Sequence, residues 1–138
     1  MGHTHYWEGV KTLTPEFVDA VQKVVTTCRV PLVLEHDVPE TSPEISTDGI
    51  RFNGVESNGH ETFVFQRSSS FQFCKTARKP YDRAVTAVLS LAHHFGLVQS
   101  VTSDGDTRDW ADGVDLARTS TGLDVEVPPN IREAFLRS

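Results

Sequence analysis

The chain has 138 residues, of which 38% are hydrophobic and 23% are charged, with a net charge of −6 and a pI near 5.4. This length and balance fit one domain with its own core and exclude a wholly disordered chain. The acidic balance also disfavours a general binder of duplex nucleic acid, because phosphate affinity depends on basic surface. No apolar run approaches the ~20 residues that cross a bilayer, and the start lacks the pattern of a secretory signal, so we expect a cytoplasmic protein without a membrane partner.

The first half of the chain begins with a predicted strand and a predicted helix. Residues 3–7 are rich in Thr, Tyr and Trp, and a strand there would place His3, His5 and Trp7 on one face. A helix is predicted over about 15–28, because a capping threonine and a proline at the first helical position precede apolar residues at helical spacing. These two elements predict that strands and helices both contribute to the core.

Prolines, glycine and acidic residues predict an extended loop over 31–49, with a short strand at 32–34. A second strand is predicted at 50–53, followed by glycine-containing turns. The segments 62–67 and 71–76 then flank three serines, a pattern typical of a hairpin.

The predicted hairpin has a definite register. A three-residue loop pairs Phe65 with Phe73 and Phe63 with Lys75. The expected core face of the hairpin then carries four phenylalanines, which are Phe63, Phe65, Phe71 and Phe73.

The second half of the chain predicts further helices and a strand. A helix that starts at Pro80 and stops at Gly96 has a wide apolar stripe and should be the most buried helix. A strand follows at 98–103, a weaker helix at 109–118 and a short last helix at about 130–136.

The element order indicates a single α+β domain over residues 1–138. We expect an antiparallel or mixed sheet with the hairpin of 62–67 and 71–76 at its centre and helices packed on it.

The most unusual segment is Phe73-Cys-Lys-Thr-Ala-Arg-Lys-Pro-Tyr-Asp82, where a predicted strand runs into a predicted helix. Lys75, Arg78 and Lys79 lie just before or at the helix N-terminus. Exposed amides and the helix dipole favour an anion at such an end, and Thr76 adds a hydroxyl donor. The other interpretation is a solvated turn whose cations pair with neighbouring acids.

A hydrolase is a second interpretation of the polar residues. His60 and Glu61 precede an apolar strand, and a His-x-Thr sequence there is similar to half of the paired motif of two-histidine phosphoesterases. Such an enzyme would use His60 as base and Lys75 or Lys79 to stabilise negative charge. Glu61 or Asp104 would orient the base or hold a metal. A second His-x-Thr motif followed by an apolar residue is absent from the sequence.

A metal site is a weaker interpretation of the histidines near the start. His3 and His5 could act as ligands two residues apart on one strand face, and His60 or a carboxylate would have to complete the set. Nothing in the spacing demands a metal, so we predict neither a metal nor another cofactor, and the alternative stays open. Asp104 begins a sequence similar to a calcium loop, but the later ligand positions do not fit.

Six motifs recur together in a family of small proteins of tailed bacteriophages and bacteria. They are His3-Thr-His-Tyr-Trp7, Phe52-Asn-Gly54, His60-Glu-Thr-Phe63, Phe73-Cys-Lys-Thr-Ala-Arg-Lys-Pro-Tyr-Asp82, Ser103-Asp-Gly105 and Trp110. The chain resembles this family over residues 1 to about 118, except that His3 replaces the tyrosine of the usual Met-Gly-Tyr-Thr-His-Tyr start. The resemblance implies a shared fold and site but transfers no activity. Together with Arg78, its motifs nominate the ligand-binding candidates His5, Asn53, His60, Glu61, Lys75, Thr76, Lys79, Tyr81, Asp82 and Asp104.

Three functions follow as hypotheses. The first is binding of a small anionic ligand, such as a nucleotide-derived signal, which a phage-encoded protein in the host cytoplasm could sequester as an anti-defence measure. The second is the phosphoesterase-like hydrolase that uses His60 and Lys75. The third is a protein-interaction module in which the polar motifs only tie loops together. A homo-oligomer with a pocket between subunits is compatible with the first.

Overall fold

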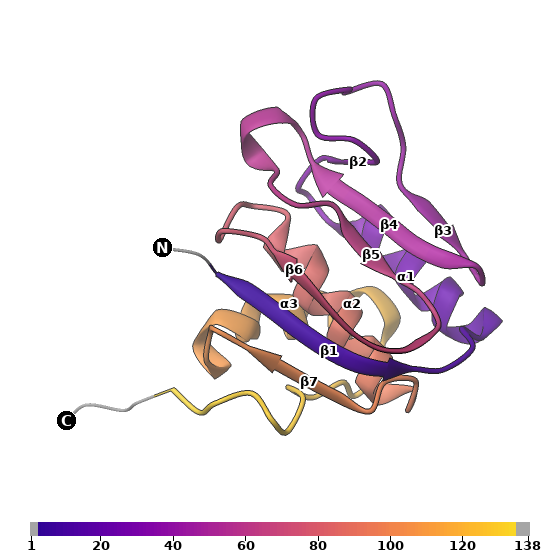
Figure 1. Ribbon diagram of the computed structural model, residues 1–138, viewed down its shortest axis with the longest axis vertical. Helices are drawn as coiled ribbons and strands as arrows, with labels where there is room; N and C mark the ends of the chain where they lie inside the picture. Colours follow the sequence, from indigo (N-terminus) through magenta and orange to yellow (C-terminus); the bar gives the residue numbers. More distant parts are fainter. Residues whose placement is uncertain (1–2, 135–138) are drawn as a thin grey trace.

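The computed structural model describes residues 3–134, which form seven strands and three α-helices (Figure 1). The elements, in chain order, are β1 (Thr4–Val10), α1 (Pro15–Thr27), β2 (Leu32–Val33), β3 (Glu44–Ser46), β4 (Gly49–Gly54), the 3-10 turn η1 (Glu56–Asn58), β5 (Phe63–Phe65), β6 (Ser68–Lys75), α2 (Asp82–His94), β7 (Ser100–Ser103) and α3 (Thr107–Thr121). Within this described part, no helix has both the length and the apolar composition needed to cross a membrane.

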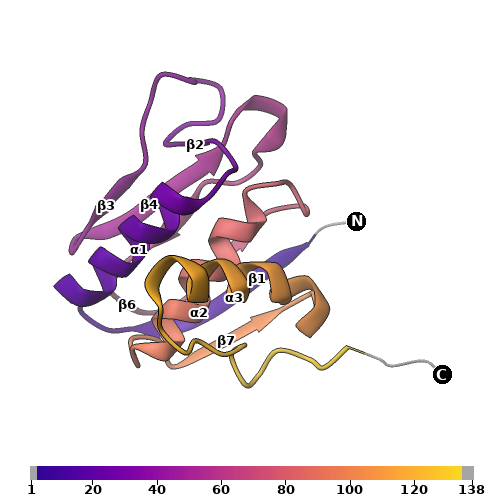
Figure 2. The same cartoon turned by 180° about the vertical axis from the view of Figure 1, so that it is seen from behind.

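The strands form two antiparallel sheets. One has the order β6-β1-β7, and the other has the order β2-β4-β3, with β5 also paired to β4. Seen from behind, α1 lies over the second sheet, while α2 and α3 lie over the first (Figure 2). The α+β class and the antiparallel sheet are therefore confirmed.

Local capping explains where the helices begin and end. The Thr14 side chain accepts a hydrogen bond from the amide of Phe17, as expected for the N-cap of α1. Gly96 has a φ of +70° just after α2, a conformation that favours glycine and ends the helix as predicted. An unpredicted capping box between Asp106 and Asp109 starts α3 two residues earlier than expected.

The hairpin of 62–67 and 71–76 was a wrong prediction. Instead, β5 pairs with β4, and β6 pairs with β1, so the two segments lie in different sheets. The physical reason is that the three serines do not turn the chain. They already belong to β6, which begins at Ser68.

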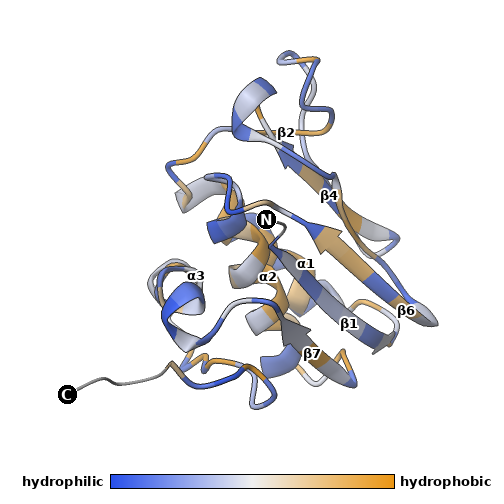
Figure 3. Cartoon of the chain, turned by 60° about the vertical axis from the view of Figure 1, so that its left-hand side comes forward, coloured by the Kyte–Doolittle hydropathy of each residue, from blue (hydrophilic) through white to orange (hydrophobic). Residues whose placement is uncertain are grey.

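The expected core face of the hairpin is correspondingly only half right. Phe63 and Phe65 are fully buried, but Phe71 and Phe73 are 59% and 57% exposed. Pairing with β1 turns Cys74 of β6 inward, and alternation then sends Phe71 and Phe73 to the outer face, where Phe71 stacks on Tyr6. Figure 3 shows a hydrophobic stretch on β6, next to β1.

Two other predictions differ from the structure in detail. The first strand continues beyond residue 7 to Val10, because Gly9 adopts a φ of +70° at an irregularity in the pairing. The last helix, predicted over 130–136, does not form in 130–134, where Arg132 instead bridges to Asp106. Residues 135–138 lie outside the described residues. The predictions for α1, β2, β4 and a buried α2 are confirmed.

Candidate functional site

The basic segment leaves β6 through a turn with an unusual backbone. Ala77 and Arg78 have φ values of +52° and +58°, in the left-handed region that costs a non-glycine residue roughly 1–2 kcal/mol. Main-chain hydrogen bonds hold the turn: the Ala77 amide donates to the carbonyl of His3, and the Lys79 amide donates to that of Thr76. Backbone strain of this kind is often found at functional sites, so the turn indicates where a functional site could lie.

A hollow of about 290 Å³ lies beside this turn, between the start of α2 and α3. We call it the His3 hollow, and its lining consists of His3, Val30, Arg78, Lys79, Pro80, Asp82, Arg83, Asp109, Asp112 and Gly113. Arg78 forms an ion pair of 2.6 Å with Asp109. Across the described residues, Lys79 and Arg83 form no ion pair. Of the three cations that line the hollow, Lys79 and Arg83 are thus available to a ligand.

A buried polar cluster adjoins the His3 hollow, which two of its members, His3 and Asp82, line. The His5 ring is fully buried, with Nδ1 at 2.7 Å from Ser103 Oγ and Nε2 at 2.6 Å from Asp82 Oδ1. Thr76 Oγ1 donates a further hydrogen bond of 2.6 Å to the same carboxylate oxygen. In contrast, the buried Nε2 of His3 has no hydrogen-bond partner among the described residues.

The cluster also shifts the ionisation of its members. Burial of Asp82 favours the neutral acid, but the hydrogen bonds from His5 and Thr76 outweigh burial and lower the pKa of this carboxyl below its ordinary value. Burial, reinforced by the neighbouring His5, lowers the pKa of His3. Asp82 is therefore a carboxylate and His3 a neutral imidazole at neutral pH.

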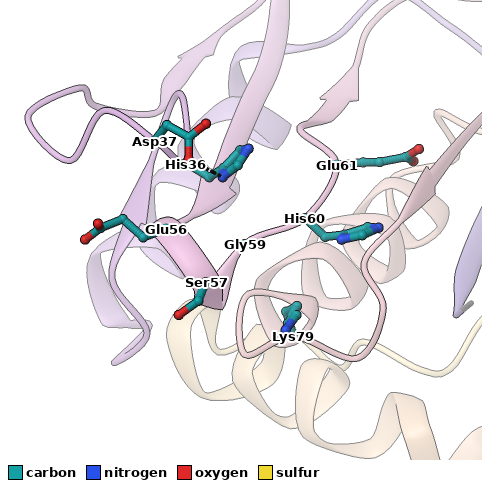
Figure 4. Close-up of a pocket in the computed structure, with 8 residues that line it drawn as sticks. All are labelled: His36, Asp37, Glu56, Ser57, Gly59, His60, Glu61 and Lys79. Atoms are coloured by element: carbon teal, nitrogen blue, oxygen red, sulfur yellow. Dashed lines mark ion pairs between the residues drawn. The ribbon is translucent and has the colours of Figure 1, made fainter.

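A second hollow, of about 560 Å³, lies on the other side of Lys79 (Figure 4). Its lining residues are His36, Asp37, Glu56, Ser57, Gly59, His60, Glu61 and Lys79. Three of these are acids and only one is a lysine, so the hollow is poorly suited to an anion. The two hollows share Lys79.

The structure gives His60 no partner that would make it a general base. Its main chain is fixed by Asn53, which accepts from the His60 amide at 3.1 Å and donates to the His60 carbonyl at 3.0 Å. Its side chain is exposed, and within residues 3–134 the ring makes no hydrogen bond. A base needs a second group to orient it, and the hydrolase interpretation lacks that group here.

Several predicted ligand residues are instead buried side chains that hydrogen-bond to neighbouring segments of the chain. The Tyr81 side chain is fully buried, and its hydroxyl donates to the Glu61 carbonyl at 2.5 Å and to the Lys75 carbonyl at 3.4 Å. Asn53 and Thr76 are also fully buried. These residues shape the site from within, and their hydrogen bonds need no ligand.

The structure brings only some of the candidate residues near the start of α2 together. His60, Glu61 and Lys79 line one hollow, but Lys75 lines neither, although its amide donates to Glu61 Oε1 at 2.6 Å. Asp104 also lines neither hollow and accepts hydrogen bonds from Thr4 and Tyr6.

The helix N-terminus does not offer the expected free amides. The amide of Asp82 already donates to the Lys79 carbonyl, and that of Ala84 donates to the Tyr81 carbonyl. The carboxylate of Asp82, the first residue of α2, also complements the helix dipole. An anion in the His3 hollow would therefore depend on side chains.

Three residues in or next to the His3 hollow were not predicted from the sequence. Arg83 and Asp109 lie inside predicted helices, where charges are usually solvated, and nothing in the sequence distinguishes them. Ser103 could have been found, because β7 alternation places it on the same face as the buried Val101. Ser103, His5 and Asp82 form a hydrogen-bonded chain, but Ser103 lines neither hollow and could not reach a substrate there.

No protein-family model matches the chain, and neither a curated protein nor a solved structure does. The resemblance to the bacteriophage and bacterial family therefore stays a prediction.

Proposed function

We propose that this protein binds a small anionic ligand in the His3 hollow. The observation that carries the proposal is that Arg78, Lys79 and Arg83 surround one hollow in a chain whose net charge is −6. Clustered cations attract anions locally. Three aspartates line the same hollow, but Lys79 and Arg83 form no ion pair with them among the described residues. The strained turn at Ala77 supports the proposal, since it places Arg78 and Lys79 next to Arg83.

The size and charge of the His3 hollow limit the ligand. Its volume of about 290 Å³ is at the lower end of small-molecule sites, which span roughly 300–1,000 Å³. Asp109 is already paired with Arg78, and Asp82 is already hydrogen-bonded to His5, which leaves Asp112 opposite the two unpaired cations. The best ligand is therefore a single phosphate group or the phosphate end of a nucleotide, rather than a polyanion.

Binding without turnover suits this arrangement better than the hydrolase that uses His60 and Lys75, because the His60 ring makes no hydrogen bond among the described residues and Lys75 lines neither hollow. A protein of this kind would sequester a nucleotide-derived signal in the cytoplasm. The resemblance to bacteriophage proteins transfers no activity, and we propose this role by analogy as the biological use of the site.

Isothermal titration with inorganic phosphate, AMP and ADP tests the proposal, with adenosine as the uncharged control. We expect at least one phosphate compound to bind and adenosine not to bind. Lys79→Ala and Arg83→Ala should each weaken binding about tenfold, since a charge-assisted hydrogen bond contributes about 1.4 kcal/mol. Lys23→Ala is the matched control, because this lysine pairs with Asp19 on α1, away from the hollow.

Two results would contradict the proposal. One is the absence of binding to all three phosphate compounds at millimolar concentration. The other is binding that Lys79→Ala and Arg83→Ala leave as tight as Lys23→Ala does. Chromatography of the same ligand solutions after incubation separates sequestration from hydrolysis, because only an enzyme would release product at more than one equivalent.

A further inference from the structure

Two histidines and a carboxylate converge beside the His3 hollow, which His3 and Asp82 line. His3 and His5 come from the beginning of the chain, and Asp82 is the first residue of α2. One potential ligand atom from each side chain lies within 4.8 Å of the other two. We infer that His3, His5 and Asp82 bind one divalent transition-metal ion, with Zn²⁺ the best fit.

The geometry needs only a small adjustment to accept the ion. Tetrahedral Zn²⁺ with bonds of about 2.0–2.2 Å holds its ligand atoms roughly 3.4 Å apart. His5 Nε2 and Asp82 Oδ1 are 2.6 Å apart and would separate by about 0.8 Å, while the ligand atom of His3, which lies within 4.8 Å of both, would approach them by at most about 1.4 Å. The two histidines point to one side of the sheet because they are two residues apart in the chain.

An independent observation is that the buried His3 ring has a nitrogen without a hydrogen-bond partner among the described residues. The His3 side chain is only 2% exposed, yet its buried Nε2 has no hydrogen-bond partner among the described residues. The large majority of buried side-chain polar atoms have a partner, and an ion is one of the standard explanations for an exception. Gly105 leaves the space for this ring, since a Cβ at that position would come within 2.6 Å of His3 Cε1.

The hydrogen bonds around the cluster are those that metal ligands usually have. His5 Nδ1 lies 2.7 Å from Ser103 Oγ, so Nδ1–H can donate to the hydroxyl and leave the Nε2 lone pair for the ion. Thr76 donates to Asp82 Oδ1 and fixes the orientation of the carboxylate. Partners of this kind orient ligands and strengthen metal binding.

Three protein ligands leave one position of a tetrahedron open. His3 and Asp82 line the His3 hollow, so a water molecule or a ligand oxygen from that side would complete the coordination. Asp109 and Asp112 in the same lining offset the repulsion between the ion and the neighbouring cations. The metal site does not depend on the anionic ligand and can be tested without it.

Titration of EDTA-treated protein with Zn²⁺ in phosphate-free buffer tests the inference. We expect one ion per chain with a Kd at or below about 1 μM, and His3→Leu should raise that Kd at least 100-fold. His3→Leu suits the test because His3 Nε2 has no hydrogen bond to lose, so the variant should fold. His94→Ala is the matched control, since His94 lies at the other end of α2 and should leave the Kd unchanged.

Co²⁺ provides a second measurement that reports geometry. We expect an intense visible absorption band typical of tetrahedral Co²⁺ in the wild-type protein and in His94→Ala, but not in His3→Leu. The inference is overturned if Zn²⁺ binds no tighter than about 1 mM. It is equally overturned if His3→Leu binds Zn²⁺ like the wild type, because binding would then belong to surface histidines. Because no phosphate compound is present, failure of the anion titration would leave this result unaffected.

Discussion

Replacing Tyr81 by Phe should destabilise the protein although it removes only one oxygen atom. The Tyr81 hydroxyl is buried, and burial raises its pKa above the ordinary value, so it stays a hydrogen-bond donor at any physiological pH. It donates mainly to the Glu61 carbonyl, which joins α2 to the segment before β5. The hydrogen bond is partly buried, and a buried polar group that loses its partner costs about 1–3 kcal/mol. Cys74 Sγ, 3.6 Å from the same carbonyl, is a weak substitute donor, so we expect a loss of about 2 kcal/mol.

Urea unfolding followed by circular dichroism measures this loss as a change in midpoint at constant slope. For 138 residues, about 2 kcal/mol corresponds to a fall in Tm of roughly 7 °C. Tyr6→Phe is the matched control, because its exposed hydroxyl makes only a long hydrogen bond of 3.3 Å to Asp104, and we expect a loss below about 0.5 kcal/mol. The reasoning is refuted if Tyr81→Phe is as stable as Tyr6→Phe.

Three further predictions follow from burial and backbone geometry. Ala77→Gly should raise the free energy of unfolding by about 1 kcal/mol in the same assay, because glycine adopts a φ of +52° without strain, and an unchanged or lower value would contradict this. Burial raises the pKa of the Cys74 thiol to about 12, so it should resist iodoacetamide at pH 8, where roughly one thiol in ten thousand is ionised, while the partly exposed Cys28 reacts first, as peptide mapping would show. Phe73→Ala should cost less than about 1 kcal/mol, against the 3–5 kcal/mol of a core phenylalanine, and a loss in the core range would place Phe73 in the core after all.

Features that depend on neighbouring residues could be predicted from the sequence. The start of α1 follows from a capping threonine and a proline, and the end of α2 follows from a glycine with positive φ. The burial of α2 follows from its wide apolar stripe, and residues 84–92 are indeed all buried. Each of these signals lies within a few residues of the feature it predicts, so no knowledge of the tertiary structure is needed.

Strand partners could not be predicted in the same way. The two phenylalanine-containing segments alternate correctly for a hairpin, and the serines between them are compatible with a turn. Alternation shows that Phe71 and Phe73 share a face, but it does not show which face is inward. The choice is made by β1, which pairs with β6 and brings His5 opposite Cys74, so that face of β6 turns to the core.

The same central position of β1 explains why the candidate site could be only partly predicted. His5 meets Asp82, 77 positions later in the chain, and Ser103, 98 positions later. Both contacts exist because β1 lies between β6 and β7. His5 therefore lies close to Asp82, which follows β6 in the chain, and to Ser103, which is the last residue of β7. The sequence showed that His3 and His5 share a face and that a carboxylate would have to complete a metal site, but only the sheet order selects Asp82 as that carboxylate. A site built on a central strand takes its partners from both neighbouring strands, and these partners are fixed by strand order rather than by any local motif.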